Sequence, residues 1–392
     1  MRLLCLTTRL PYPPNRGDRL RAFHFIRQLS QHHQLTLVSF IAGRAERDHL
    51  PALRSYCAAV HLVERSTIRS VAATGLNFWR TEPLQSLYYR DRAMQQLVEQ
   101  LVADTAFDAA YIHLFRMANY LAGQSDVYRI VDLTDVISLE VTKSLPYRPW
   151  LWRFIYRLER PRIARYECRV AQTFEETWLI SGADRNALAA ICPEANLQVV
   201  PNGVDFTRFQ PAQQQAVPNS LIFVGHMGVF HNVDAASYLV NEILPLVRQE
   251  VPEVKLWLVG AEPSPVVRQL AQPGVEVTGF VPDLNDYLNR AAVFVAPLRF
   301  AAGVQNKVLE AMAAARPVIT TPLVNEGLEG SAGKQLLLAD DAPTFASHIV
   351  ELLRDQQRRE ALGQAGRRFV QEKYSWQHVV RRVAAIERKL QG

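Results

Sequence analysis

One stretch in the second half of the chain constrains the fold most strongly, because strand, loop and helix patterns follow one another directly. Residues 291–296 are apolar throughout, which is typical of a parallel strand covered on both faces. A glycine-bearing loop follows, and residues from about 304 to 315 then place Val308, Leu309 and Met312 on one face of a helix. The stretch predicts one βα unit of an open α/β sheet.

The loop of this unit is a place where an open α/β sheet binds anions. The carboxyl end of the strand offers free backbone N–H groups at the positive end of the helix dipole. Lys307 and Arg299 add two cations, and Glu310 lies on the first helical turns. The residues therefore predict an anion-binding site. A purely structural βα unit with an incidental glycine is the alternative that this stretch alone leaves open.

The same alternation of short apolar strands and amphipathic helices covers the whole chain in two successive runs. The helices include one that begins after Asp18 and one over residues 84–103. This order predicts an α/β fold with two Rossmann-like, doubly wound domains whose strand carboxyl ends face each other across a cleft. Strands are expected at 2–7, 35–41, 109–114, 127–133, 177–181, 197–201, 221–224, 255–259, 275–278 and 317–320.

A polar segment that contains several glutamines and two prolines, residues 205–218, marks the expected domain boundary. The predicted domains are 1–205, which a basic amphipathic helix at 375–392 joins, and 206–374. His113 ends one strand of the first domain, and polar residues at such positions point into the cleft of this kind of fold. His113 is therefore a candidate functional residue, although a lone histidine at a strand end is equally compatible with a structural role.

Charge is distributed unevenly along the chain. The net charge is +6, and residues 1–200 hold 25 lysines and arginines against 19 acidic residues. Such an excess favours an anionic partner, either nucleic acid or an acidic membrane surface, and a solvated basic face is the plain alternative. Residues 149–170 combine aromatic residues with arginines, which suits either a membrane surface or a helix packed on its own domain. Pro161 is expected to kink this helix or to start a second one.

Several function classes lack their sequence signatures. No apolar run reaches the length of a membrane span and no signal-peptide cleavage site follows the N-terminus. The four scattered cysteines are expected to be reduced thiols. We therefore expect a cytoplasmic protein, with peripheral binding to the inner face of the cell membrane as the alternative location. The chain has no nucleic-acid-binding module, no metal motif and no three-glycine dinucleotide fingerprint, so we expect no nucleic acid, no metal and no cofactor.

Short motifs in the second half of the chain follow one another in a fixed order. They are Asn202-Gly203-Val204-Asp205, Phe223-Val224-Gly225, Gly279-Phe280-Val281-Pro282-Asp283, Pro297-Leu298-Arg299, Lys307-Val308-Leu309-Glu310-Ala311-Met312-Ala313 and Arg316-Pro317-Val318-Ile319. This set resembles the family 4 retaining glycosyltransferases of the GT-B fold. The loop and helix that contain Lys307, with Asn232-Val233-Asp234-Ala235 upstream, are similar to a subgroup of bacterial sugar transferases associated with exopolysaccharide gene clusters.

The resemblance implies retaining, metal-independent transfer of a hexosyl group from a nucleotide-diphosphate sugar, which is a substrate rather than a cofactor, to a glycan or lipid-linked acceptor. It implies that Glu310 holds the donor ribose, that Val281 lies near the base, and that His113 lies near the donor sugar. The implied donor-binding residues are Gly17, Gly225, His226, Val281, Gly303, Val304, Gln305, Asn306 and Glu310. The candidate catalytic residues are His113, which the resemblance implies, and Lys307 and Arg299, which are the cations beside the expected anion site.

The sequence departs from the pattern of this family at two places. The usual glutamate eight residues before the ribose glutamate is Ala302, and the usual arginine and lysine that grip the diphosphate are replaced by His226 and by His231 or a neighbour. A pyrophosphate needs compensating charge, so Lys307 and Arg299 are the expected substitutes. Two alternatives remain open, a non-catalytic sugar-nucleotide-binding component of a polysaccharide assembly complex and a nucleotide-sugar epimerase of the same fold.

Overall fold

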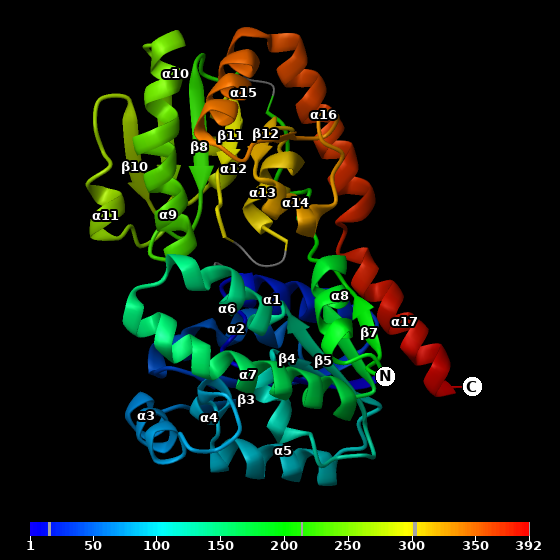
Figure 1. Ribbon diagram of the computed structural model, residues 1–392. Helices are drawn as coiled ribbons and strands as arrows, with labels where there is room; N and C mark the ends of the chain where they lie inside the picture. The colour runs from blue at the N-terminus through cyan, green and yellow to red at the C-terminus, as the bar shows by residue number, and fades with distance from the viewer. Residues whose placement is uncertain (15–16, 213–214, 301–303, 392) are drawn as a thin grey trace. The chain divides into compact units, whose positions relative to one another are not determined.

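The computed structural model describes residues 1–14, 17–212, 215–300 and 304–391. The chain divides into two compact units, shown together in Figure 1. The first unit consists of Met1–Pro201 and Trp376–Gly392, and the second of Asn202–Ser375. The division therefore falls just before the segment 205–218, and the C-terminal helix α17 (Gln377–Gln391) is part of the first unit.

The first unit is built on a seven-stranded sheet in the order β3-β2-β1-β4-β5-β6-β7, in which all paired strands are parallel. Its strands are β1 (Arg2–Thr7), β2 (Gln34–Ile41), β3 (Ala59–Glu64), β4 (Ala109–His113), β5 (Tyr128–Thr134), β6 (Glu176–Leu179) and β7 (Leu197–Val199). Its α-helices besides α17 are α1 (Gly17–Leu29), α2 (Leu50–Arg54), α3 (Thr67–Leu76), α4 (Leu84–Tyr88), α5 (Arg92–Asp104), α6 (Ile137–Ser144), α7 (Trp150–Thr173) and α8 (Gly182–Ile191). Three short 3-10 helices are η1 (Arg44–His49), η2 (Phe115–Tyr120) and η3 (Leu145–Tyr147).

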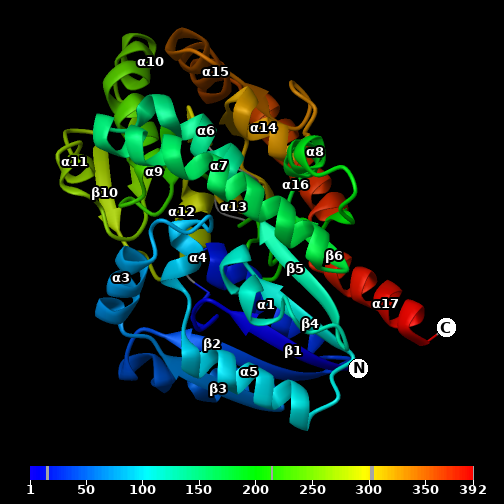
Figure 2. The ribbon, with the colours of Figure 1, turned by 60° about the horizontal axis from the view of Figure 1, so that its bottom comes forward.

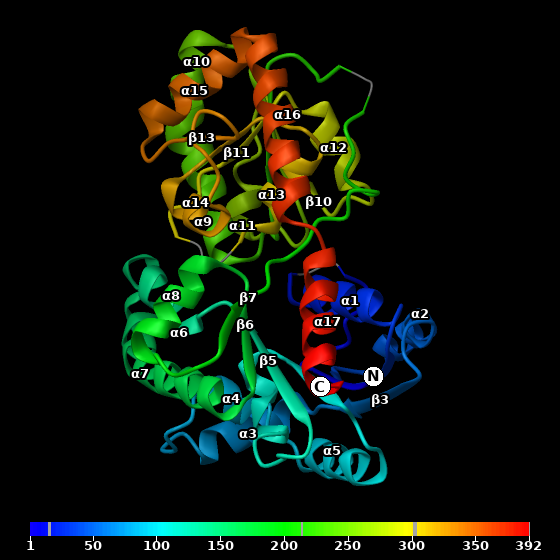
Figure 3. The ribbon, with the colours of Figure 1, turned by 90° about the vertical axis from the view of Figure 1, so that its right-hand side faces the viewer.

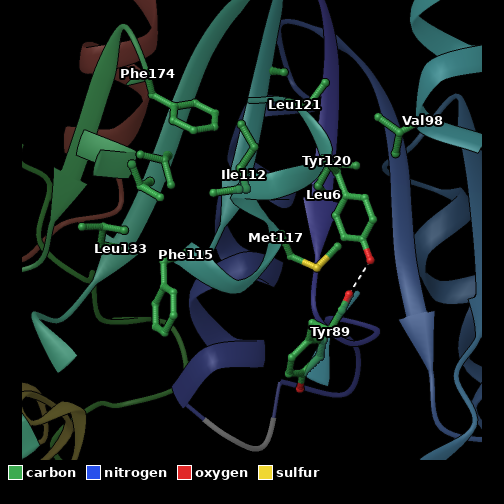
Figure 4. Packing of buried hydrophobic residues seen from close by; sticks show 14 of the residues in the cluster. Leu6, Tyr89, Val98, Ile112, Phe115, Met117, Tyr120, Leu121, Leu133 and Phe174 are labelled. Carbon is green, nitrogen blue, oxygen red and sulfur yellow. Dashed lines mark hydrogen bonds between the residues drawn. The ribbon is translucent and has the colours of Figure 1, made fainter. Parts of the chain in front are cut away.

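Strand β1 shows how the two faces of this sheet are covered. Its side chains alternate between the faces, so Leu4 and Leu6 join one apolar cluster and Leu3 and Cys5 join the other. The first cluster includes residues of α5, α7 and η2, and Figure 4 shows its tight packing and the hydrogen bond that the Tyr120 hydroxyl donates to the carbonyl of Tyr89. The second cluster includes residues of α1 and α17, which lie side by side in Figure 3. Both faces are therefore buried, as a parallel sheet requires.

The second unit repeats the plan with a six-stranded parallel sheet in the order β10-β9-β8-β11-β12-β13. Its strands are β8 (Ser220–Val224), β9 (Lys255–Val259), β10 (Val275–Gly279), β11 (Val293–Ala296), β12 (Val318–Thr320) and β13 (Leu337–Leu338). Its helices are α9 (Phe230–Tyr238), the π-helical turn η4 (Leu239–Ile243), α10 (Leu244–Glu250), α11 (Pro265–Arg268), α12 (Leu284–Arg290), α13 (Asn306–Ala313), α14 (Pro322–Leu328), α15 (Ala342–Arg354) and α16 (Gln356–Lys373). Helix α10 packs with α15, and α13 packs with α16.

The α/β class and the two doubly wound sheets are confirmed, but three local predictions were wrong. Residues 84–103 form two helices, because Asp91 adopts an extended conformation and its side chain caps α5 by accepting from the Met94 N–H. Helix α1 begins at Gly17, so Asp18 lies within its first turn instead of preceding it. Pro161 lies inside one continuous helix, α7, so a second helix does not start there, and most of the buried residues of α7 lie after Pro161.

Candidate functional site

The carboxyl edge of the second sheet is formed by glycines that follow neighbouring strands closely. Gly225 follows β8 and donates its N–H to the carbonyl of Val259 at 3.0 Å, while Gly260 follows β9 and donates to Gly279 at 3.0 Å. Gly260 has φ +149°, and a Cβ atom there would lie 1.7 Å from the carbonyl oxygen of Gly225. The two backbones can approach this closely only because Gly260 has no side chain.

Gly225 also makes room for the side chain of Asn232, on the first turn of α9. A Cβ atom on Gly225 would lie 2.7–2.9 Å from the amide atoms of Asn232. Asn232 is buried, with 3% of its surface exposed. Its Nδ2 donates to the carbonyl of His226 at 3.0 Å, and its Oδ1 accepts a hydrogen bond from the Nζ of Lys307. The glycine turn, α9 and α13 therefore converge on one amide group.

Lys307 lies on the first turn of α13, and its side chain is half-buried beside this amide. Its Nζ lies 5.3 Å from the ring centre of Phe223, within the range of a cation–π interaction. Burial lowers the pKa of Lys307 to about 7, although the charge of Glu310 acts in the opposite direction. The ammonium group is thus poorly compensated by the protein alone, and a bound anion would stabilise it.

Glu310 follows Lys307 by one helical turn and is also half-buried. Burial raises the pKa of Glu310 to about 7, against the attraction of Arg208 and Lys307. Near neutral pH the two side chains therefore both lie close to their titration midpoints. An anion close to Lys307 would favour the charged ammonium form of this side chain. Hydroxyl donors close to Glu310 would likewise favour its charged carboxylate form.

The residues just before α13 divide into those that the structure describes and those that it does not. Gly303, together with Ala302, lies outside the described residues. The side chain of Val304 is buried, so only its backbone is suited to contact a ligand. Gln305 is the N-cap residue, and Asn306 accepts a hydrogen bond from the Nδ2 of Asn202 at 2.8 Å. The first turn of α13 directs its backbone N–H groups and the positive end of its dipole toward this segment.

The two other predicted cation positions have partners within the second unit. Arg299 binds the carboxylate of Asp234 through two hydrogen bonds of 3.0 and 2.5 Å, and its guanidinium stacks on Tyr238 at 4.9 Å. The Nε2 of His226 lies 3.4 Å from a carboxylate oxygen of Glu262. Both residues follow the carboxyl ends of their strands, at the edge of the sheet where the donor site is predicted. Their roles toward a ligand stay predictions.

Val281 lies in the loop after β10, where it is half-buried. The preceding residue, Phe280, is 70% exposed. An exposed aromatic ring at the carboxyl edge of a sheet offers a stacking surface for a planar group. The contact between Val281 and a base stays a prediction.

His113 and Gly17 belong to the first unit, and their surroundings are described within that unit. Gly17 is the exposed first residue of α1. His113 ends β4 and is buried, with its Nδ1 3.2 Å from the hydroxyl of Tyr111 and 3.7 Å from a carboxylate oxygen of Asp132. Its Nε2 is buried, and no hydrogen-bond partner for this atom occurs among the described residues.

Asp132 anchors this second polar group. It accepts two hydrogen bonds from the guanidinium of Arg21, at 2.7 and 3.0 Å, and one from the hydroxyl of Tyr111 at 2.6 Å. Burial alone would raise the pKa of Asp132, but Arg21 and His113 hold it well below its usual range. The orientation of His113 is thus tied to a permanently charged pair.

Sequence reasoning missed the side-chain pairings that build these groups. Asn232 occurs in one of the quoted motifs, but its pairing with Lys307 spans 75 positions of the chain. Arg21 and Asp132 are separated by 111 positions and carry no joint signal. No group of three or more His, Cys, Asp or Glu side chains arranged to hold a metal ion occurs within the part of the chain that the structure describes.

Comparison with known proteins gives the class of protein that this chain resembles. Residues 218–355, which lie in the second unit, match the family model described as Glycosyl transferases group 1, and the match includes Asn232, Lys307 and Glu310. The whole chain has the GT-B fold. The Anabaena protein Alr3699/HepE, solved in complex with UDP and glucose, matches 99% of this chain and 100% of its own with a TM-score of 0.71. The identity is 14%, so this likeness is one of fold.

Two particular proteins are similar in sequence over shorter stretches. An uncharacterized 44.6 kDa protein in the cps region of Klebsiella pneumoniae is 25% identical over 164 residues, which make up 40% of this chain and 42% of that protein. Alpha-maltose-1-phosphate synthase of Mycolicibacterium smegmatis is 28% identical over 224 residues, which make up 50% of this chain and 57% of that protein. The chain thus spans about half the length of these relatives.

Proposed function

We propose that this chain is a retaining, metal-independent hexosyltransferase of the family 4 type. It moves a sugar from a nucleotide-diphosphate donor to a hydroxyl group of a glycan or lipid-linked acceptor in cell-surface or exopolysaccharide biosynthesis. The group 1 domain at residues 218–355 and the GT-B fold support the reaction class. The UDP and glucose bound by the Anabaena protein support a sugar-nucleotide donor, and the cps-region relative supports the biosynthetic setting.

One observation carries this proposal: Lys307 and Glu310 occupy the first turns of α13, beside the glycine turn after β8. We assign the donor diphosphate to the Nζ of Lys307 and the N-terminus of α13, which together supply positive charge. We assign the ribose hydroxyls to Glu310, whose carboxylate accepts hydrogen bonds. The separation of one helical turn between the two side chains suits the separation of a diphosphate from its own ribose.

The chemical step that we propose needs charge stabilisation more than covalent participation of the protein. The bond between the anomeric carbon and the diphosphate oxygen breaks, and the departing oxygen takes the proton of the acceptor hydroxyl, which attacks on the same face of the sugar. Lys307 and the helix dipole stabilise the negative charge that develops on the diphosphate. His113, whose buried Nε2 is available for a hydrogen bond, is assigned to the donor sugar.

Binding and product analysis test this function. Purified protein is titrated with UDP, GDP, ADP and their sugar conjugates by calorimetry, and the reaction with lipid-linked acceptors is followed by NMR of the anomeric proton. We expect one nucleoside diphosphate to bind, Glu310→Gln and Lys307→Met to weaken that binding, and Lys334→Met, which alters an exposed lysine of the same unit, to leave it unchanged. If no nucleotide binds, or both site variants bind like the native chain, the assignment fails.

A second candidate is a protein that binds a sugar nucleotide without transferring the sugar. It is favoured by the ion pair between Arg299 and Asp234, which engages one of the two cations expected to grip the diphosphate. The same experiments separate the two functions, because donor binding without a new glycosidic bond supports the second. Release of an epimerised free sugar would instead support an epimerase of this fold.

A further inference from the structure

The exposed apolar side chains of the described residues are concentrated in two segments of the first unit. Ten of the fifteen large ones come from α3 with the turn after it and from the first turns of α7, and each is at least half exposed. We call these ten residues the tryptophan face. They are Ile68, Val71, Leu76, Phe78, Trp79, Trp150, Leu151, Trp152, Phe154 and Leu158.

The tryptophans of the chain divide sharply between this face and the interior. Trp79, Trp150 and Trp152 are 65%, 80% and 50% exposed. The other three, Trp178, Trp257 and Trp376, are all buried. Because burying a tryptophan side chain removes a large apolar area from water, three exposed ones on two connected segments mark an interaction surface.

Two hydrogen bonds hold the segments of this face together. The guanidinium of Arg162 in α7 donates to the carbonyl of Phe78 at 3.0 Å, and the N–H of Leu84 donates to the carboxylate of Glu159 at 2.8 Å. The chain that joins α3 to α4 (Figure 2) therefore lies against the middle of α7, at Glu159 and Arg162. From there the first turns of α7 extend outward, and residues 150–154 are all exposed.

The charges around the tryptophan face have one sign. Residues 65–81 contain three arginines and no acidic residue, and residues 141–158 contain one lysine, three arginines and no acidic residue. The nearest acid along α7, Glu159, is buried and bound to Arg162 and to the Leu84 N–H. The face thus combines exposed tryptophans with exposed cations such as Arg153 and Arg157.

We propose that the tryptophan face is a docking surface for an anionic lipid bilayer. Tryptophan side chains are suited to the boundary between headgroups and acyl chains, and each arginine near an anionic leaflet adds electrostatic attraction. A second copy of this chain fits less well, because a two-fold contact would set the same cations against each other with no acid between them. No helix within the described ranges has the length and apolar character to cross a bilayer, so the contact is one with the membrane surface.

Vesicle binding tests this proposal, and it is measured without donor or acceptor so that it is independent of the proposed transfer. The native chain is sedimented with vesicles of pure phosphatidylcholine and with vesicles of equal parts phosphatidylcholine and phosphatidylglycerol. We expect binding to the anionic vesicles only, and weaker binding as salt is raised, because screening shortens the reach of the arginines. The double variant Trp152→Ser with Arg157→Glu should bind at least about tenfold more weakly.

A matched control separates the surface from general charge effects. The variant Ile191→Ser with Arg185→Glu alters one exposed apolar residue and one exposed arginine on α8 of the same unit, and it should bind like the native chain. Brominated lipids should quench the native tryptophan fluorescence, and replacing Trp79, Trp150 and Trp152 by phenylalanine should abolish that quenching. Equal binding to both kinds of vesicle, no vesicle binding, or a dimer in solution that Trp152→Ser with Arg157→Glu disrupts would overturn the proposal.

Discussion

Arg21 and Asp132 in the first unit bind each other directly, whereas Lys307 and Glu310 in the second unit lie one helical turn apart and Lys307 hydrogen bonds to the neutral amide of Asn232. In the first pair two hydrogen bonds satisfy both charges, and the pKa of Asp132 stays well below its usual range. In the second pair burial brings both pKa values to about 7. A buried ion pair with complete hydrogen bonds is needed by the fold, because the loss of either partner leaves a buried unpaired charge. An incompletely satisfied pair is left ready for a ligand.

The largest effect should come from breaking the pair in the first unit. Asp132→Asn leaves the Arg21 guanidinium buried without a counter-charge, and we expect the free energy of unfolding to fall by about 3–5 kcal/mol. Urea denaturation followed by circular dichroism measures this loss. Asp126→Asn, an exposed change in the same unit, should alter stability by less than about 0.5 kcal/mol. If Asp132→Asn and Asp126→Asn lowered the free energy of unfolding equally, the expected importance of the Arg21–Asp132 pair for the fold would be contradicted.

The second effect concerns ligand binding rather than folding. Lys307→Met removes the ammonium group that we assign to the diphosphate, and a hydrogen bond to a charged group contributes about 1.5–3 kcal/mol. The affinity for the nucleoside diphosphate should therefore fall roughly 10–150-fold, as calorimetry can measure. The unfolding midpoint should not fall, because an incompletely compensated buried charge is removed. If Lys307→Met strongly lowered stability and left the affinity for the nucleoside diphosphate unchanged, Lys307 would serve the fold and not the ligand.

The pH dependence of donor binding should show both titrations. Because burial lowers the pKa of Lys307 to about 7, the free site loses its ammonium charge as the pH rises above this value, and affinity should fall by up to about tenfold per pH unit. Because burial raises the pKa of Glu310 to about 7, the carboxylate is protonated below this value, and affinity should also fall toward acid.

Calorimetric measurement of the donor affinity on both sides of pH 7 separates the acid and alkaline limbs of its pH profile when two variants are compared with the native chain. Lys307→Arg keeps its charge at high pH and should flatten the alkaline limb, whereas Glu310→Gln should flatten the acid limb. An affinity that is constant between pH 6 and pH 8 for the native chain would be incompatible with about 7 as the pKa of either residue.

The smallest effect is expected from Asn232, which positions Lys307 without contacting the proposed donor. Asn232→Ala removes one hydrogen bond and should weaken binding about fivefold, since such a bond contributes about 1 kcal/mol. Asn232→Asp should raise the pKa of Lys307 and move the alkaline limb to higher pH. If neither variant moves the pH profile, Asn232 has only a structural role.

Local sequence patterns were sufficient for most of the framework. The strand at residues 255–259 was predicted with the observed limits, because an apolar run in a parallel sheet has abrupt ends. The start of α5 was missed although Asp91 is a good N-cap residue, since the helical pattern continues on both sides of it. Lys307 and Glu310 were predicted to lie on the first turns of one helix because they are close in sequence, and the structure confirms this placement.

By itself, the sequence determined the α/β order, the two sheets and the placement of the Lys307 helix directly after a strand, because each depends on periodicity over a few neighbouring residues. Only the tertiary structure decided that Asn232 holds Lys307, that Arg299 pairs with Asp234, and that His113 lies beside Asp132. These partners are brought together by strand order and burial, and burial shifts the pKa values of Lys307 and Glu310. No local pattern encodes such contacts, because their free energy arises only when distant segments exclude water from the same place.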